Sequence, residues 1–492
     1  MMAVNPYGIS DRVDAITQQT FYRLAAPFYQ SAARDDIIVV LLTEPGIRNL
    51  QERGLFRANI WPIAYRDHAY ILDRIMEQGP KSLLIDVYFD RQRSTDNTLE
   101  MLRARLERGI REHDVDVFHA AGFGDADPTP IQKMLSATGS RPVITGWEAL
   151  GEGYPLQSVL GPSATYAIYE SYCLRSVPAA ACDVPRLSPY DVPVYDSPDS
   201  PGEGLSVYWG SDPPPPLFAE DTTGACERGP IGWWAALREL GGNLVIGLVG
   251  LDASQPQVAC PYHRFITADY LATVLRAGTE GEKARIHELL HNKIVLYGVK
   301  FEGAVDTVDS PVHGRIPAVF LHAMALDNLM NFGDRYVRAG VSYAGVISIF
   351  AWLVLVTVYA WGLRWLERKT GGTGCFPVGE EKAGQNPPVE KDGAQRPRQG
   401  GTLVNLIRRH PKWFMSLGVG IAVVLFALLM FVVGRLEPVN SIAFLGLLAM
   451  LGILRGSKLE ASVLNKFGLK NINNLNETTP KEECRHESSD TR

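Results

Sequence analysis

The chain has 492 residues, more than one ordinary hydrophobic core organises, so two or three structural units are expected. Its 48 basic and 54 acidic side chains give a net charge of −6, and it contains no basic face or aromatic RNA-binding motif, so nucleic-acid binding is not expected. A phosphate-binding loop, a kinase signature and a serine-nucleophile elbow are also absent from the sequence. We therefore predict neither an enzyme nor a bound cofactor.

Strands and helices are predicted to alternate through the first 145 residues. The run DIIVVLLT is continuously apolar between its first aspartate and its last threonine, as in a strand that is buried on both faces. The predicted strands cover residues 36–43, 81–87, 114–120 and 142–145, and the predicted helices cover residues 45–53, 65–78, 99–110 and 130–136. This alternation indicates an α/β fold with a mostly parallel sheet flanked by helices.

The second half of this domain is less regular. Residues 146–230 are rich in Pro, Gly, Ser and Tyr, which indicates an insertion on the surface of the domain. We then predict helices over residues 233–240, 265–275 and 283–291 and a strand over residues 243–248. The stretch from Lys293 predicts a strand stopped by Gly298, an acidic loop, and a helix over residues 319–329. The domain is therefore expected to cover residues 1–338.

Three long apolar runs follow, at residues 341–363, 413–434 and 438–454. A helix needs about 20 apolar residues to cross a bilayer, so we predict three transmembrane helices, with a buried core hairpin as the alternative for the last two. Lys and Arg are concentrated in the loop 364–412, which is predicted to be disordered, and recur at the start of the tail 455–492. The positive-inside rule places this loop and the tail in the cytoplasm and the N-terminal domain outside.

Several carboxylates follow two of the predicted strands. Asp86 and Asp90 flank the end of the second strand, and Asp306 and Asp309 follow the strand that begins after Lys293. Because the carboxyl ends of parallel strands gather at one edge of a sheet, where ligands bind, these residues and His322 are candidates for holding a cation or a polar ligand. The alternative is structural: Asp86 caps a helix or loop and His322 makes a core hydrogen bond.

The sequence HELLH, from His287 to His291, matches the HExxH zinc pattern. Two histidines four positions apart share one face of a helix and can bind zinc, with the glutamate between them as a general base. The expected helix is short, and no third ligand is evident. An ordinary connecting helix is therefore the favoured interpretation, and a membrane-anchored zinc hydrolase is the alternative.

Four of the six cysteines lie close together in the sequence, and none belongs to a CxxC pair. They are Cys173, Cys182, Cys226 and Cys260. If this part of the chain lies outside the cytoplasm, one or two disulfides are expected among them, with the pairing left open.

Several short stretches are informative through their order along the chain. They are Trp61-Pro62 followed by Arg66, Gly79-Pro80-Lys81 leading into LLIDVYF, then KIVLYG, Asp306, Ser310-Pro311 and LHAMALDNL. With three apolar runs after them, these stretches resemble the CHASE type 2 domain family over most of residues 10–335. CHASE domains are sensory extracellular domains associated with cyclases and histidine kinases.

The resemblance implies a bacterial inner-membrane receptor with an extracytoplasmic sensory domain for a small molecule or an envelope signal. No output domain is evident after the third apolar run, so the signal would pass to a separate cytoplasmic partner, and a homodimer is compatible with this arrangement. The family normally carries a membrane helix or a signal before the domain. Residues 1–23 lack the signal-peptide pattern, so we expect an export segment upstream of Met1. An unusual route of export or a cytoplasmic domain is the alternative.

Overall fold

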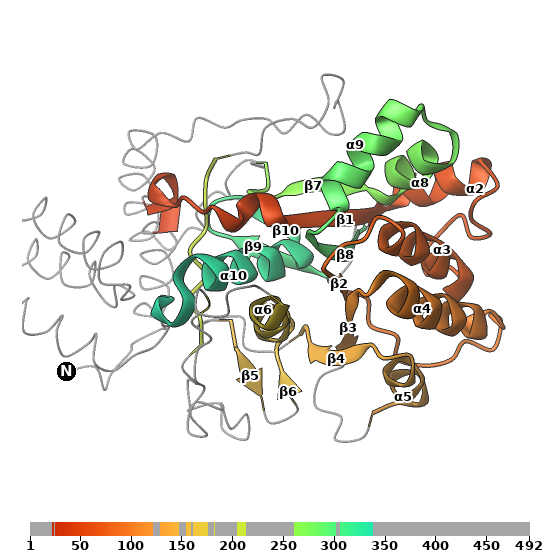
Figure 1. Cartoon of the computed structure of the whole chain (residues 1–492), viewed down its shortest axis with the longest axis horizontal. Coiled ribbons are helices and arrows are strands. Elements are labelled where there is room, and N and C mark those ends of the chain that lie inside the picture. The colour runs from red at the N-terminus through yellow and green to blue at the C-terminus, as the bar shows by residue number, and fades with distance from the viewer. Residues whose placement is uncertain are drawn as a thin grey trace, which may run out of the picture. The chain divides into compact units, whose positions relative to one another are not determined.

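Six strands form the central sheet of the domain, in the order β4-β3-β2-β8-β1-β7 (Figure 1). The computed structural model describes residues 22–23, 25–121, 128–146, 154–158, 161–175, 182, 204–212, 260–301 and 306–337. The strands are β1 Ile37–Thr43, β2 Ser82–Ile85, β3 Asp116–Ala121, β4 Arg141–Ile144, β7 Arg264–Thr267 and β8 Ile294–Lys300. All neighbouring strands in this sheet pair in parallel, which confirms the predicted mostly parallel α/β fold.

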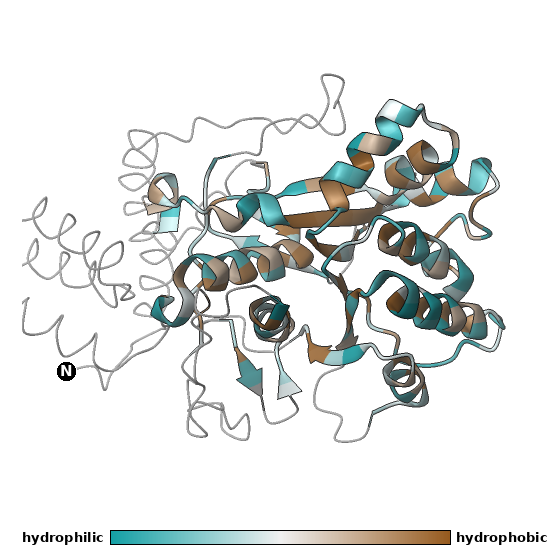
Figure 2. Ribbon diagram, viewed as in Figure 1, coloured by the Kyte–Doolittle hydropathy of each residue, from teal (hydrophilic) through white to brown (hydrophobic). Residues whose placement is uncertain are grey.

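Helices cover both faces of the sheet. In β1, the even-numbered residues from Ile38 to Leu42 belong to the hydrophobic core on one face, and the odd-numbered residues from Ile37 to Leu41 belong to the core on the other. The first core is covered by α2 Glu44–Glu52, α3 Tyr65–Met76, α4 Leu99–His113, α5 Pro130–Ala137, α8 Ala268–Ala277 and α9 Glu280–Leu290. The second core is covered by α6 Ala164–Arg175 and α10 Val319–Phe332. Figure 2 shows the hydrophobic residues of β1 between these layers.

Side-chain caps fix where three of the helices begin. Thr43 Oγ1 accepts a hydrogen bond from the Gly46 amide at the start of α2, at 3.1 Å. Thr129 makes the same kind of contact at the start of α5, and Thr279 forms a capping box with Glu282 at the start of α9. These contacts satisfy amide groups that the first turn of a helix leaves without an intrahelical partner, so they explain why the predicted starts of these helices lie close to the observed ones.

Two predicted elements differ in the structure. The helix expected over residues 265–275 is a short edge strand, β7, followed by α8, because β7 pairs with β1 over four residues. The strand expected to stop at Gly298 continues to Lys300. Gly298 pairs with Leu41 inside the sheet, and its missing side chain makes room for Val319 of α10.

The segment 146–230 is not only a surface insertion. Its described part contains the short hairpin of β5 Gln157–Ser158 and β6 Gly161–Pro162, and then α6, which packs against α10 inside the second core. The prediction that this segment lies on the surface is therefore wrong for α6. The composition gave no indication of a buried helix because the buried positions of α6 mix Ala, Thr, Ser and Tyr with a single Ile, so they form no apolar stripe.

Shorter elements complete the described chain. The acidic loop expected after β8 contains an antiparallel hairpin of β9 Thr307–Ser310 and β10 Gly314–Pro317. Three 3-10 turns, η2 Ala26–Phe28, η3 Ala33–Asp36 and η5 Gly333–Arg335, lie before β1 and after α10. The elements predicted over residues 233–240 and 243–248 lie outside the described residues.

The three predicted membrane runs, the loop 364–412 and the tail 455–492 also lie outside the described residues. Within the part of the chain that the structure describes, no helix combines the length and the apolar character needed to span a bilayer.

Candidate functional site

The carboxyl ends of β2 and β8 lie side by side, and the chain leaves them toward opposite faces of the sheet. The last residue of β2, Ile85, pairs with Tyr297 of β8. After β2 the chain leads to α4, which packs in the first core, and after β8 it leads through β9 and β10 to α10 in the second core. In open α/β sheets, ligands bind outside the carboxyl ends of neighbouring strands whose connections diverge in this way. The topology therefore selects the end of β2 and β8 as the candidate site.

Asp86 lies at this position and faces α10. Leu84 belongs to the second core, whereas Ile85 and Val87 belong to the first, so the alternation places the Asp86 side chain on the face of the second core. His322 lies in the first turn of α10, and its Nε2 is 3.7 Å from Asp86 Oδ1. Both side chains are buried. The pair joins α10 to the end of β2.

A hydrogen-bond chain joins His322 to α6. The Thr165 amide of α6 donates to the Tyr154 hydroxyl, which lies 2.7 Å from His322 Nδ1. The hydroxyl and the imidazole therefore share a hydrogen bond inside the second core. Burial lowers the pKa of His322 to about 4, so this imidazole is neutral at physiological pH.

Asp306 completes the candidate site from the segment that follows β8. Its backbone carbonyl accepts a hydrogen bond of 3.3 Å from the amide of Ala318, the residue that caps α10. Burial and then the charge of Asp86 raise the pKa of Asp306 to about 7, and His322 opposes this shift. The backbone of Asp306 is thus hydrogen-bonded to the start of α10, and its pKa responds to the charge of Asp86 at the end of β2.

Asp86 also has an unusually high pKa for a carboxyl group. Burial raises its pKa to about 7, and a hydrogen bond with Thr145, just after β4, only partly opposes this shift. Its Oδ2 atom is buried and has no hydrogen-bond partner among the described residues. A buried carboxyl oxygen without a partner is costly, which makes it a candidate for contact with a proton or a ligand.

Two predicted site residues do not join this cluster. Asp90 is exposed and forms a 3.6 Å ion pair with its neighbour Arg91. Asp309 is exposed on β9, opposite Arg315 in the β9–β10 register. Neither is among the charges that shift the pKa values of the buried cluster. The structure thus brings together three of the five predicted residues.

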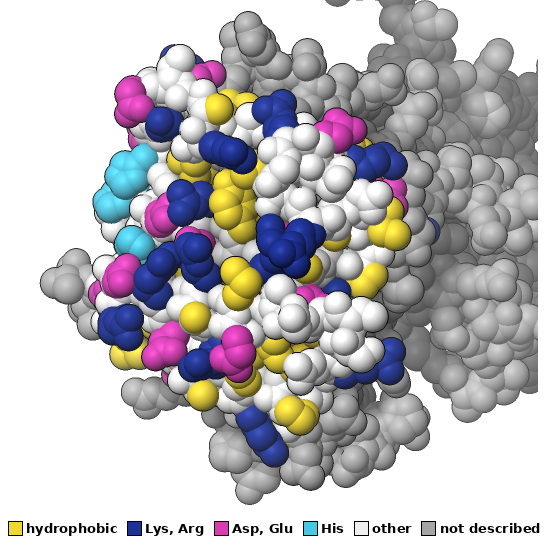
Figure 3. Space-filling model, turned by 90° about the vertical axis from the view of Figure 1, so that its right-hand side faces the viewer, with side chains coloured by type: hydrophobic (Ala, Val, Ile, Leu, Met, Phe, Trp, Pro, Cys, Tyr) yellow, Lys and Arg dark blue, Asp and Glu magenta, His cyan; other side chains and the backbone are white. Residues whose placement is uncertain are grey.

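The two histidines of HELLH lie at the surface, His287 on α9 and His291 directly after it. His287 and His291 are exposed, and their rings stack with centroids 4.7 Å apart. His291 ends α9, and its Nδ1 lies 3.2 Å from the carbonyl oxygen of Gln78. In the described ranges, no group of three or more His, Cys, Asp or Glu side chains is arranged to hold a metal ion. Figure 3 shows histidine side chains at the surface along one edge of the view.

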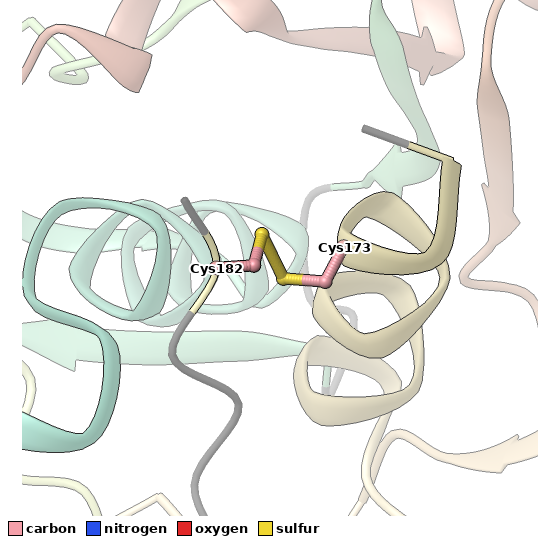
Figure 4. The surroundings of a disulfide bond; sticks show 2 residues. All are labelled: Cys173 and Cys182. Atoms are coloured by element: carbon pink, nitrogen blue, oxygen red, sulfur yellow. A yellow bond between two sulfur atoms is a disulfide. The ribbon is translucent and has the colours of Figure 1, made fainter. Parts of the chain in front are cut away.

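One disulfide joins two of the four clustered cysteines. Cys173 of α6 is bonded to Cys182, with Cα atoms 5.4 Å apart (Figure 4). Cys260 is a free thiol, and Cys226 lies outside the described residues. Structural disulfides persist mainly in oxidising compartments, so this bond is consistent with a domain outside the cytoplasm.

Sequence reasoning missed the residues that surround His322. Tyr154, Thr165 and Thr145 lie within or beside the irregular segment 146–230, and none belongs to a recognisable motif. The tyrosine and the histidine are 168 residues apart in the sequence, and only the packing of α6 against α10 brings them together. No local signal identifies such a pair.

The second half of α10 is bound to two further segments. Asn328 Nδ2 lies within 3.1 Å of the Tyr29 hydroxyl and of the carbonyl oxygens of Tyr208 and Met324, and its Oδ1 accepts from the Tyr208 amide at 2.8 Å. The neighbouring Asp327 accepts a hydrogen bond from the Ser31 hydroxyl. The helix is therefore attached at its start to the candidate site and further along to the segment before β1.

Comparison with known proteins agrees with this architecture. The family model of the CHASE2 domain matches residues 3–197 and 221–361, which is more than half of the 492 residues. CHASE2 is a family of sensory domains of the extracellular type, so the match supports a sensory role. Neither the search of curated proteins nor the search of solved structures finds a match. On the family match, this chain belongs to the CHASE2 domain family.

Proposed function

We propose that this protein is a bacterial membrane receptor that is not itself an enzyme. Its CHASE2 domain lies outside the cytoplasm, responds to a small molecule or an envelope signal, and signals through a separate cytoplasmic partner. The observation that carries this proposal is the position of α10. The helix begins at the Asp86–His322 pair, and the first predicted membrane run begins at residue 341, nine residues after Phe332 ends the helix.

The packing of α10 suits it to transmit a displacement. At 1.5 Å per residue, the segment from His322 to Phe332 spans roughly 15 Å. Met324, Leu326 and Leu329 are fully buried along it, and closely packed helices move as units rather than by local deformation. A change at the candidate site that moves the first turn of α10 therefore moves the end of the helix that leads toward the predicted anchor.

Three further observations support the extracytoplasmic location. The family is of the extracellular type, and Cys173 and Cys182 form a disulfide. The basic loop between the first two apolar runs supports a cytoplasmic location for that loop, which puts the domain on the opposite side of the bilayer.

A deletion in the host organism tests the sensory role. Cells that produce the full chain are compared with cells that produce a chain lacking residues 22–337 but keeping all three apolar runs, and a C-terminal tag verifies equal amounts in the membrane. We expect the transcript and phosphoprotein responses to envelope stress to differ between the two strains. Identical responses over a panel of stresses would rule out a sensory role for the domain.

A further inference from the structure

Phe28 is a large apolar side chain that the domain leaves in contact with solvent. It ends the 3-10 turn η2, and 64% of it is exposed, whereas Ala26 and Tyr29 on either side are buried in the second core. Pro27, directly before it, is exposed as well. A single exposed apolar side chain is ordinary on a protein surface, so the position of Phe28 in the domain carries the argument.

The segment that carries Phe28 packs beside the point where the described chain leaves the domain. Val337 is the last described residue, and its carbonyl oxygen accepts a hydrogen bond of 2.7 Å from the Ser206 amide. The Ser206 hydroxyl is hydrogen-bonded in turn to the hydroxyl of Tyr22, shortly before η2. All three residues are buried. A chain of hydrogen bonds thus joins the segment before η2 to the end of the domain.

The end of α10 reaches the same place. The ring of Tyr29 packs edge-on against that of Phe332, the last residue of α10, with centroids 5.8 Å apart. Asn331 Nδ2 donates to the Gln30 carbonyl oxygen at 2.9 Å. Since α10 begins beside the carboxyl end of β2 and packs further along against η3, directly before β1, its end lies at the amino edge of the sheet. Phe28 therefore lies at the edge opposite to the candidate site.

The length of the connecting chain limits how far this edge can lie from the bilayer. The first predicted membrane run begins at Val341, so only residues 338–340 separate it from Val337. Fully extended, the chain from Val337 to Val341 spans at most about 14 Å. The headgroup layer on each side of the hydrocarbon core is itself roughly 5–8 Å thick. An inserted run therefore holds the edge that carries Phe28 at or directly above the headgroups.

We propose that Phe28, with Pro27 beside it, contacts the headgroup layer of the bilayer in which the first membrane run is anchored. Aromatic and aliphatic side chains bind this boundary through burial of apolar area. The exposed charges that follow α10, Asp334 and Arg335, have opposite signs, so we do not expect the contact to need anionic lipid. The inference rests on the proposed function and deepens it, because it gives the domain a second attachment to the membrane beside the end of α10.

Photochemical cross-linking of the full chain in lipid nanodiscs tests the contact. Phe28 is replaced by the photoreactive aromatic residue p-benzoylphenylalanine, and Ile60 is replaced in the same way as the matched control. Ile60 is 68% exposed and precedes Trp61, whose ring packs 4.7 Å from that of Phe301, directly after β8. The control therefore lies at the carboxyl edge of the sheet. Because β1 has seven residues, roughly 20 Å separate the two edges.

The proposal predicts phospholipid adducts at position 28 in severalfold excess over position 60, measured by mass spectrometry after digestion. Nanodiscs of phosphatidylcholine alone and of phosphatidylcholine with phosphatidylglycerol should give similar yields at position 28, because the contact is apolar. Phe28→Cys and Ile60→Cys, each carrying a fluorophore and with the cysteines outside the disulfide changed to serine, give a second readout. A lipid with a nitroxide in its headgroup should quench the label at position 28 severalfold more strongly.

Three results would overturn the proposal. They are cross-linking of position 28 to a peptide from residues 1–21, cross-linking to a second copy of the chain, and equal lipid adducts at positions 28 and 60. A chain that does not enter nanodiscs contradicts both the predicted anchor and the contact. Failure of the receptor function looks different. A receptor whose domain stands clear of the bilayer would lose its response on deletion of residues 22–337 yet show no lipid adduct, and an anchored domain without a receptor role would show the adduct and no effect of the deletion.

Discussion

His322 and Asp86 approach each other across the boundary between α10 and the sheet, with Nε2 of the histidine 3.7 Å from Oδ1 of the aspartate. Since the imidazole is neutral, this contact is not a buried ion pair, and the carboxyl group gains no full positive charge from it. At this distance the two side chains are neighbours without a hydrogen bond between them, so the protonation of Asp86 depends on its burial rather than on His322. Its behaviour with pH can be predicted with a definite sign.

Asp86→Asn is expected to stabilise the domain above neutral pH. The folded-state pKa of Asp86 is raised to about 7 from its ordinary 3.8, so its contribution to stability is full below pH 3.8, decreases as the pH rises from 3.8 to about 7, and is lost at higher pH. The asparagine resembles the neutral acid and does not lose this contribution. One pKa unit corresponds to about 1.4 kcal/mol, so the difference at alkaline pH has an upper bound of roughly 4 kcal/mol.

Urea unfolding of the wild type, Asp86→Asn and the exposed control Asp90→Asn, followed from about pH 4 to about pH 8, measures this difference. Buried neutral histidines such as His68 and His119 act in the opposite direction, but at lower pH and equally in all three proteins. The wild type and the control should lose stability together relative to Asp86→Asn. A constant difference at every pH would contradict the assigned state of Asp86.

Gly298→Ala is expected to destabilise the contact between β8 and α10. A Cβ atom at this position would lie 2.7 to 3.0 Å from three side-chain atoms of Val319, and overpacking of this kind costs about 1–3 kcal/mol. Val319→Gly removes these atoms, so the double variant should be more stable than the sum of the two single effects predicts. Gly281→Ala, with no atom within 4 Å of the added methyl group, is the matched control. Additive effects in the unfolding free energy would contradict the packing.

Removal of the disulfide is expected to loosen α6. Cys173 and Cys182 are nine positions apart, and closing a loop of this size stabilises a fold by about 2–3 kcal/mol in the chain-entropy model. Alkylation of the denatured, unreduced protein followed by mass spectrometry should leave both residues unmodified and modify Cys260. Cys173→Ser should lower the midpoint of urea unfolding, whereas Cys260→Ser should leave it nearly unchanged. Alkylation of Cys173 or Cys182 before reduction would contradict the bond.

Metal analysis separates the receptor from the alternative of a zinc hydrolase. We expect the purified chain to contain substoichiometric zinc and His287→Ala to leave the zinc content unchanged, because the two exposed histidines are not accompanied by a third ligand in the described residues. One zinc ion per chain, lost in His287→Ala and retained in the control His113→Ala, would favour the hydrolase.

The elements that the sequence predicts well are those with a local cause. The continuous apolar run of β1 requires burial on both faces, and α5 begins at the predicted Pro130, directly after its cap Thr129. β7 was missed because it has only four residues and exists through its pairing with β1, more than 200 residues earlier in the chain. The strand order is likewise a long-range property, since β8 lies between β1 and β2.

Part of the candidate site could likewise be predicted from the sequence, and part required the structure. Asp86, Asp306 and His322 were identified from the rule that strand ends share an edge. That rule does not separate them from Asp90 and Asp309, which differ from them in burial rather than in position along the chain. The partners from the segment 146–230 required the structure, because nothing in that composition indicates a helix packed against α10.

The sidedness of the domain tests the central claim most directly. Arg285 is exposed on α9, so Arg285→Cys places a reactive thiol on the domain, and Cys375 lies in the loop predicted to be cytoplasmic. Each variant keeps one of these thiols, and the remaining cysteines outside the Cys173–Cys182 bond, which are Cys226, Cys260 and Cys484, are changed to serine. A membrane-impermeant maleimide is applied to intact cells and to lysed cells. The account predicts labelling of Arg285→Cys in intact cells and labelling of Cys375 only after lysis. Labelling of both thiols only after lysis would place the domain in the cytoplasm and contradict an extracytoplasmic receptor.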